Sequence, residues 1–249
     1  MPFSLLQNLR KCVIGSAFLL GCVSAHAEVI AVGATPTAVP FHFLDVKTNT
    51  LQGVLIDVIH AVGKDAGFEP QVQAIPFTSL IPSLQTDRIE IVASLLAMTP
   101  QRREVVDFSD PILTFGETLA IPAGDNKDYK TPADLNGMTV GTMAGTTFVE
   151  MLQKTPGIKE VRIFDSMPEM LRDLTVGRID AAMGDRPVMQ YLITSSGNKK
   201  VKIAPNFVEA TKQPNGLTVK KGDKELLDRL NASLARLKAN GTLDEIYRK

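Results

Sequence analysis

The chain has no tryptophan, and its two cysteines, Cys12 and Cys22, both lie near the start of its 249 residues. If that start is removed, neither a disulfide nor a thiol nucleophile is available. The formal net charge is zero, so the chain lacks the basic excess typical of proteins that bind nucleic acid or an anionic membrane. Beyond the first segment, no apolar run is long enough to cross a bilayer.

The first segment is predicted to be a signal peptide spanning residues 1–27. Arg10-Lys11 forms a basic region, and the apolar run from Cys12 to Val23 is too short to span a membrane. Ala25-His26-Ala27 has the small–x–small pattern of a cleavage site, so the mature chain is expected to begin at Glu28 and to work in the periplasm. A buried N-terminal helix is the less favoured alternative.

A lipid-anchored form is a second alternative to simple secretion. Residues 19–22, Leu-Leu-Gly-Cys, resemble a bacterial lipobox, which would leave a lipidated Cys22. Leu20 is uncommon at its position in that motif, so cleavage after Ala27 is preferred. Loss of the leader would leave 25 basic against 27 acidic residues, a balance that still gives no reason to expect a nucleic-acid partner.

Short apolar runs alternate with amphipathic helical patterns along the rest of the chain. This alternation predicts an α/β fold with mostly parallel sheets flanked by helices. A polar segment with Pro and Gly follows Ile121 and indicates a boundary between two units. The expected strands are 29–34, 72–75, 89–96, 139–143, 161–164, 179–183 and 216–220, and the expected helices cover 55–66, 80–85 and 168–174 or begin at Pro100, Thr147, Arg186 and Asp223.

One internal echo suggests that the two units are related. Residues 84–95 align with residues 174–185, since both contain a helix end, a turn, an Arg-Ile-acid triplet and a strand. A chance match is the alternative. If the echo is real, Leu95 and Asp185 end equivalent strands, and two lobes that face each other would place Arg102 and Asp185 across one cleft.

Arg102 is the first candidate for a ligand-binding residue. Thr99 is a good helix N-cap and Pro100 suits the first helical position, so Arg102 is expected in the first helical turn at the C-terminal edge of a sheet. There, a guanidinium can hold a small carboxylate in a planar fork. A solvated surface arginine is an equally weighted alternative. The neighbouring Arg103 is expected to pair with Asp107.

Three further segments supply candidate residues. Gly145-Thr146-Thr147 follows a strand and opens a helix, and Thr146 offers a hydroxyl there; an ordinary turn is the alternative. Asp185 ends a strand and either caps the next helix or presents a carboxylate to an ammonium group. Together with Arg102, these residues match a zwitterion. Phe77 is either a core residue or a wall of the pocket.

Other kinds of site find little support. His42 and His60 are the histidines that remain after processing, and their spacing does not suit metal ligation with an acidic third partner. No serine sits in a Gly-x-Ser-x-Gly motif, and the Walker pattern is absent. The sequence therefore predicts no catalytic residue, no metal and no cofactor.

At these residues the chain resembles the polar amino-acid family, family 3, of periplasmic solute-binding proteins, which serve ABC importers. The resemblance implies two α/β lobes joined by two hinge strands, which close on a ligand between them. It also implies that Arg102 clamps an α-carboxylate with help from Thr146 and its neighbour Thr147, that Asp185 takes the α-amine, and that Phe77 lines the side-chain pocket. The matching segments are Val32-Gly33, Pro40-Phe41, 53–57, 80–85, 98–102, 107–111, 145–147, 177–181 and 240–243.

The chain departs from the family pattern at several pocket positions. Ala38 stands where an aromatic residue is usual, and Ala97 replaces a Ser or Thr, which removes one hydroxyl bond to the amine. Leu95 replaces a small or polar residue, although its carbonyl can still accept, and Val54-Leu55 lacks the usual acid. The carboxylate clamp is thus kept while recognition of the amine is weakened. The loss of one hydrogen bond lowers the affinity roughly tenfold.

The expected protein binds a small amino acid or related carboxylate and passes it to a membrane permease as a monomer. Lobe 1 is expected to comprise residues 28–122 and 215–249, and lobe 2 residues 123–214. An enzyme on the same scaffold, such as a periplasmic dehydratase, would need a cleft acid with a raised pKa. A sensory module that presents the ligand to a receptor is the other alternative.

Overall fold

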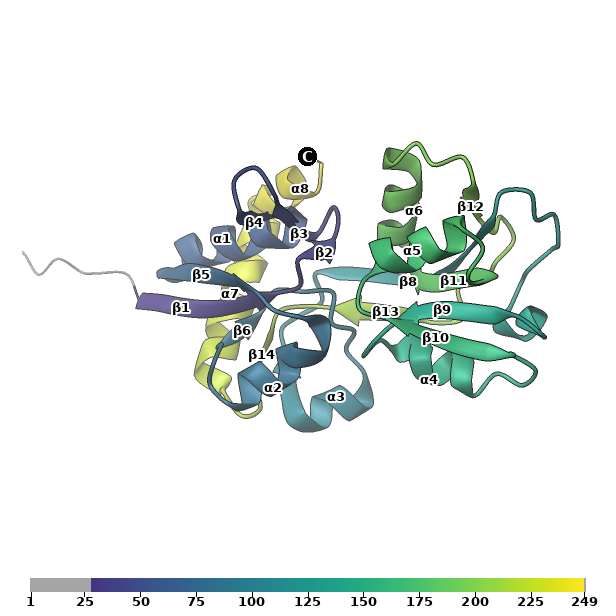
Figure 1. Cartoon of the computed structure of the whole chain (residues 1–249). Coiled ribbons are helices and arrows are strands. Elements are labelled where there is room, and N and C mark those ends of the chain that lie inside the picture. The colour runs from purple at the N-terminus through teal and green to yellow at the C-terminus, as the bar shows by residue number, and fades with distance from the viewer. Residues whose placement is uncertain (1–27, 249) are drawn as a thin grey trace, which may run out of the picture.

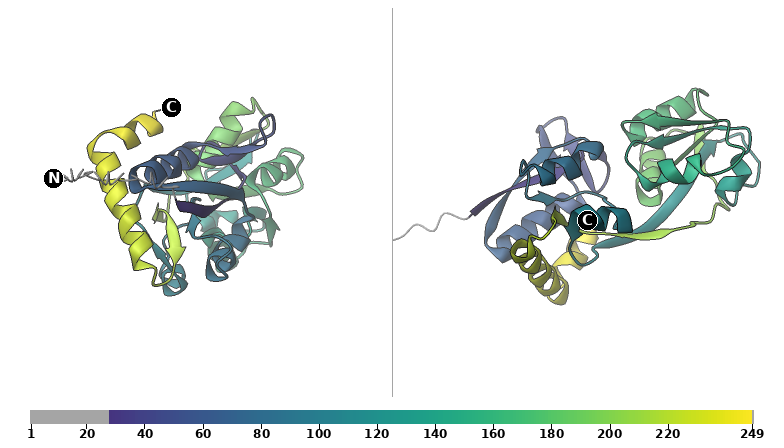
Figure 2. Two further views of the ribbon diagram at one scale, coloured as in Figure 1. Left: turned by 90° about the vertical axis from the view of Figure 1, so that its left-hand side faces the viewer. Right: turned by 90° about the horizontal axis from the view of Figure 1, so that it is seen from below.

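The computed structural model describes residues 28–248, so the predicted signal peptide and the alternative lipidation site at Cys22 lie outside the described part. Two α/β lobes lie side by side, and two strands, β8 (Leu113–Pro122) and β13 (Lys212–Asn215), run between them (Figure 1). The same two connections are visible from below (Figure 2). Within residues 28–248, no helix combines the length and the apolar character that crossing a membrane requires.

The first lobe is built on a five-stranded sheet of order β5-β1-β6-β14-β7. β1 pairs in parallel with β5 and β6, whereas β14 runs antiparallel to β6 and β7. A small antiparallel sheet, β2-β3-β4, accompanies it. The elements are β1 (Glu28–Ala34), β2 (Thr37–Ala38), β3 (His42–Asp45), β4 (Thr50–Gln52), α1 (Val54–Ala66), β5 (Phe68–Ala74), η1 (Phe77–Ser79), α2 (Leu80–Gln85), β6 (Ile91–Val92), α3 (Pro100–Val105), β7 (Val106–Phe108), β14 (Thr218–Lys220), α7 (Lys224–Ala239) and α8 (Thr242–Tyr247).

The second lobe has a sheet of order β10-β9-β11-β8-β12, in which β9, β10 and β11 are parallel and β8 is antiparallel to β11. Helices α5 and α6 lie on one side of this sheet and α4 on the other (Figure 1). The elements are β8 (Leu113–Pro122), η2 (Pro132–Leu135), β9 (Thr139–Met143), α4 (Thr147–Gln153), β10 (Glu160–Phe164), α5 (Met167–Thr175), β11 (Ala181–Asp185), α6 (Arg186–Ser195), β12 (Val201–Ile203) and β13 (Lys212–Asn215).

The connection between the lobes is an antiparallel pair of strands. β8 pairs with β13 over Leu113–Gly116, with Phe115 opposite Gln213, and the rest of β8 lies inside the second sheet. The predicted boundary at residue 122 falls at the end of β8, and the one at residue 215 falls at the end of β13. The boundaries themselves stay a prediction.

The internal echo is reproduced in the backbone. Asp87 and Gly177, at equivalent positions, both have positive φ, 55° and 75° respectively. The acid that follows each turn accepts a hydrogen bond from the neighbouring strand: Glu90 from the Ala31 N–H at 2.8 Å, and Asp180 from the Thr139 N–H at 2.7 Å. The two lobes therefore repeat one local design, as the sequence comparison predicted.

Two local predictions are wrong. The strand expected over residues 89–96 pairs only at Ile91–Val92, because the chain then turns and the Leu95 N–H donates to the His42 ring at 3.1 Å. Arg103 does not pair with Asp107, because α3 ends at Val105 and Asp107 lies in β7, where Lys221 holds it. The Arg103 guanidinium instead lies 5.3 Å from the centre of the Phe108 ring.

Helix α7 covers the first lobe with the leucine stripe that the sequence predicted. Asp223 caps the helix by accepting from the Leu226 N–H at 3.1 Å, and Leu230 is fully buried against the core of the first sheet. Helical spacing places the stripe's members on one face. They are Leu226, Leu227, Leu230, Leu234 and Leu237.

Substituting Leu230→Ala is expected to destabilise the protein by about 2–5 kcal/mol, because it removes buried methyl groups and leaves a cavity. Chemical denaturation followed by circular dichroism measures the change. The control is Lys238→Ala, at an exposed position of the same helix, which should change stability by less than about 0.5 kcal/mol. Equal effects of the two variants would contradict the assignment of Leu230 to the core.

Candidate functional site

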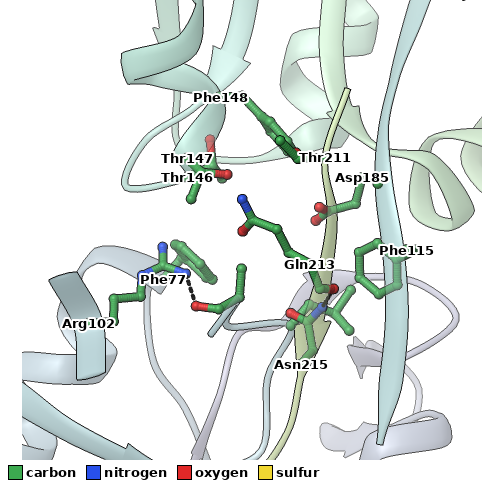
Figure 3. Close-up of a pocket in the computed structure, with 13 residues that line it drawn as sticks. Phe77, Arg102, Phe115, Thr146, Thr147, Phe148, Asp185, Thr211, Gln213 and Asn215 are labelled. Carbon is green, nitrogen blue, oxygen red and sulfur yellow. Dashed lines mark hydrogen bonds between the residues drawn. The ribbon is translucent and has the colours of Figure 1, made fainter. Parts of the chain in front are cut away.

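A pocket lies between the lobes where the C-terminal ends of the strands meet. It contains about 350 Å³ of empty space, and side chains from both lobes and from the two connecting strands surround it (Figure 3). Seven of the eight residues predicted from the sequence line it: Phe77, Leu95, Ala97, Arg102, Thr146, Thr147 and Asp185. The eighth, Ala38, lines an adjoining cavity that shares Phe77, Leu95 and Asp185 with this pocket.

The predicted capped helix places Arg102 in the pocket. The Thr99 hydroxyl accepts from the Arg102 N–H at 3.2 Å, and Pro100 begins α3. The half-buried Arg102 guanidinium donates to the Ala97 carbonyl and, across the cleft, to the Gly145 carbonyl, each at 2.9 Å. Burial lowers the pKa of Arg102 to about 10, against the opposing effect of the Asp185 carboxylate. The side chain is therefore cationic at neutral pH.

The lobes touch directly beside this arginine. The Arg102 guanidinium carbon lies 5.7 Å from the centre of the Phe77 ring, an arrangement that suits a cation–π contact. Gly145 has φ +74, and a Cβ added there would lie 3.1 Å from Thr78 Cγ2 and 3.3 Å from Phe77 Cδ1. A glycine is thus needed both for the backbone conformation and for the close approach of the first lobe.

Thr146 lines the pocket as predicted, but its hydroxyl already donates a hydrogen bond within its own lobe. It is the N-cap of α4, yet its side chain does not cap the helix; the hydroxyl donates to the Met143 carbonyl at 2.7 Å. In this orientation the oxygen, rather than its hydrogen, is offered to the cleft. The hydroxyl must rotate to donate a bond to a carboxylate.

Asp185 ends β11 and begins α6, but its side chain makes no capping hydrogen bond with the helix. Its strand partner in β8 is Glu117. Residues directly opposite each other in an antiparallel pair project to the same face, so two carboxylates are neighbours. Burial, with the Glu117 charge, raises the pKa of Asp185 to about 7, although Arg102 opposes this.

Glu117 is held by the segment that leads into β13. Fully buried, it accepts from the Ala210 N–H at 2.5 Å and from the Thr211 hydroxyl at 3.0 Å. Arg102 and the Glu117 carboxylate therefore act in opposite directions on the pKa of Asp185. An ionised Asp185 carboxylate favours a cationic group beside it.

A buried histidine supports the floor of the adjoining cavity. The His42 Nδ1 atom donates to the Thr35 carbonyl at 2.6 Å, and Nε2 faces the Leu95 N–H and the Ser94 hydroxyl. Burial lowers the pKa of His42 to about 4, so the ring is neutral and Nε2 can accept. His42 thereby fixes the backbone on which Leu95 and Ala97 reach the cleft.

The sequence reasoning missed six residues that line the pocket. They come from the connecting strands, from the residue before β13 and from the first turn of α4: Phe115, Gly116, Phe148, Thr211, Gln213 and Asn215. The alternation of Thr211, Gln213 and Asn215 is a period of two, the signal of one strand face. The alternation is visible in the sequence, but the pairing with β8 that turns this face toward the cleft is not. Among residues 28–248, no three His, Cys, Asp or Glu side chains gather as metal ligands.

Comparison with known proteins agrees with this architecture. Residues 30–249 match the model of a family described as bacterial extracellular solute-binding proteins, family 3. ABC transporter arginine-binding protein 1 of Escherichia coli K12 is 33% identical, over 97% of each chain. The L-cystine-binding protein TcyJ of the same strain is 28% identical, over 88% of this chain and 81% of that protein.

Among solved structures, the ancestral amino acid-binding protein AncCDT-1 superposes with a TM-score of 0.79. It is 31% identical, and the match covers 88% of this chain and 93% of that one. It is described as a precursor of cyclohexadienyl dehydratase.

Proposed function

Because this chain belongs to the bacterial extracellular solute-binding proteins of family 3, we propose that it captures a small α-amino acid between its lobes for an ABC importer. The observation that carries the proposal is the opposition of a guanidinium, Arg102, and a carboxylate, Asp185, on different lobes but in one pocket. A zwitterion offers one partner to each. The similarity of this chain to an arginine-binding protein and to a cystine-binding protein supports an amino-acid ligand.

In this proposal Arg102 binds the α-carboxylate through its planar fork, with the rotated Thr146 hydroxyl and Thr147 beside it. Asp185 binds the α-ammonium group. Phe77 forms a wall of the pocket, and Leu95, Ala97 and Ala38 shape the remaining space. Because Ala97 has no hydroxyl, Asp185 carries more of the amine recognition than it would beside a serine or threonine.

The working step of the proposal is closure of the lobes about β8 and β13. Arg102 already reaches the Gly145 carbonyl across the cleft. A bound carboxylate would take over part of this bonding and join the lobes through the ligand. Micromolar affinity requires about −8 kcal/mol, which a charged clamp at each end of the ligand and the closing of the cleft can supply.

We propose binding rather than catalysis, with delivery to a membrane permease. The likeness to a dehydratase precursor and the raised pKa of Asp185 favour an enzyme as the second candidate. Conversion of prephenate or arogenate by the purified protein, followed by product chromatography, would overturn the first choice. Presentation of the ligand to a sensory receptor is compatible with binding.

The proposal also places the mature protein, residues 28–249, outside the cytoplasm after removal of residues 1–27. It acts there as a monomer. Lobe 1 comprises residues 28–122 and 215–249, and lobe 2 residues 123–214. Mass spectrometry of the exported protein tests cleavage before Glu28 against a lipidated Cys22.

A thermal-shift screen tests the proposed function directly. The twenty common amino acids, citrulline, ornithine and small dicarboxylates are added singly to the mature protein. A true ligand at about 100 times its Kd should add roughly 2.7 kcal/mol of stability. Isothermal titration calorimetry then gives the affinity. Absence of binding to every α-amino acid, together with binding of a ligand without an amine, would reject the proposal.

A further inference from the structure

Three polar side chains border the cleft on β13 and directly before it. Gln213 and Asn215 are two apart on β13, so they project to the same side, Thr211 precedes the strand, and all three line the pocket (Figure 3). Two of them have hydrogen-bond partners. The Thr211 hydroxyl donates to the Glu117 carboxylate at 3.0 Å, and the Asn215 side-chain N–H donates to the main-chain carbonyl of Gln213 at 3.0 Å.

The Gln213 carboxamide is different. Its Oε1 atom is buried and has no hydrogen-bond partner among residues 28–248. The other buried side-chain atoms in that condition belong to Thr118, Thr142, Thr218 and Arg186, none of which lines this pocket. A buried acceptor without a hydrogen bond destabilises the fold. Such an atom beside a cleft therefore indicates that it accepts a hydrogen bond from a bound ligand.

The direction of the side chain shows where that group would be. Gln213 extends from β13 into the middle of the pocket, with Arg102 and Phe77 on one side and Asp185 on the other (Figure 3). Phe115, its strand partner, lies beside Asp185 in the same view. The carboxamide therefore reaches the space that a ligand held by Arg102 and Asp185 would fill.

We infer that Gln213 is a specificity-determining residue, which accepts a hydrogen bond at Oε1 from an N–H group on the side chain of the bound amino acid. The inference rests on the proposed function, in which Arg102 and Asp185 already take the two α-groups. The ligand class is then an amino acid whose side chain carries an amide, ureido or guanidinium nitrogen.

Calorimetry on the mature protein tests the inference with three donor-bearing probes, glutamine, citrulline and arginine, and one apolar probe of similar length, norleucine. The wild type should bind at least one donor-bearing probe roughly tenfold to hundredfold more tightly than norleucine. Gln213→Met, which keeps the length but removes the carboxamide, should abolish this preference and leave the norleucine affinity within about threefold. Gln213→Glu should shift the preference from citrulline towards arginine.

The matched control is Lys212→Gln, at the exposed neighbouring position of β13, which should leave all four affinities unchanged. Thermal unfolding without a probe establishes that each variant folds. If Gln213→Met does not fold, the citrulline and arginine affinities of Gln213→Glu test the inference. A wild-type preference that survives in Gln213→Met, or a wild type that binds norleucine as tightly as the donor-bearing probes, overturns this inference alone. Failure of the wild type to bind any α-amino acid overturns the proposed function with it.

Discussion

Replacing Arg102 with alanine is expected to weaken binding of the amino-acid ligand at least a hundredfold while leaving the protein folded. The guanidinium is half-buried and its hydrogen bonds go to two backbone carbonyls, those of Ala97 and Gly145. Removing one partner of a hydrogen-bonded charge pair at a binding site costs about 2–5 kcal/mol in binding. Calorimetry with the ligand found in the screen gives the affinity, and circular dichroism gives the stability.

Two further variants separate charge from geometry at this position. Arg102→Lys keeps the charge but loses the planar fork, so its affinity should lie between those of the wild type and Arg102→Ala. Arg103→Ala removes an adjacent exposed arginine that packs on Phe108 and should leave binding within about twofold. If Arg102→Ala retains the wild-type affinity, Arg102 is not the carboxylate clamp.

Asp185→Asn is expected to have opposite effects on binding and on stability. Loss of the carboxylate should weaken ligand binding by about 2–5 kcal/mol, since the ammonium group loses its charged partner. Without ligand, the same variant should be more stable at pH 8 by about 1–3 kcal/mol, because the raised pKa of Asp185 shows that its ionised form is unfavourable in the fold.

The sign of the pH dependence follows from the two pKa values of Asp185, 3.8 ordinarily and about 7 in the fold. Between these values the folded protein binds a proton that the unfolded chain does not, so this group makes stability fall as pH rises from about 4 to 7. The advantage of Asp185→Asn should therefore vanish near pH 4 and be complete above pH 7. Ligand affinity should instead weaken as pH falls below 7, as the carboxylate is protonated.

Denaturation at pH 4, 6 and 8, paired with calorimetry at pH 6 and 8, measures both effects. The control is Asp165→Asn, which removes an exposed acid from the same lobe. A stability gain that is independent of pH, or ligand affinity that does not change in Asp185→Asn, would contradict the role assigned to Asp185.

The parts of the fold that the sequence predicted are those set by local signals. The capped start of α3 needs only Thr99 and Pro100, and β9 is bounded as predicted because the whole strand is apolar or small and buried. The site followed from these local elements and the internal echo, which together placed Arg102 and Asp185 across one cleft.

The wrong or missing predictions arise where contacts with residues far away in the sequence determine the local structure. β6 is short because the Leu95 N–H donates to His42, which is far away in the sequence. The hydrophobic pattern of one segment cannot predict a hydrogen-bond acceptor on another element. Asp107 finds Lys221 rather than Arg103 because the end of α3 moves it into a strand. Gln213 was missed because its strand is short and polar, and its position beside Phe115 depends on a pairing between residues about a hundred positions apart.

The pairing of Asp185 with Glu117 also has a mechanical consequence. β8 is both a link between the lobes and an inner strand of the second sheet, and Asp185 is bonded to it in register. The carboxylate that we propose binds the ammonium group is therefore anchored in a sheet and does not lie on a loop. In the proposed closure Asp185 would move together with β8 as one rigid unit. Binding of a solute would then require little additional ordering of the protein at that end.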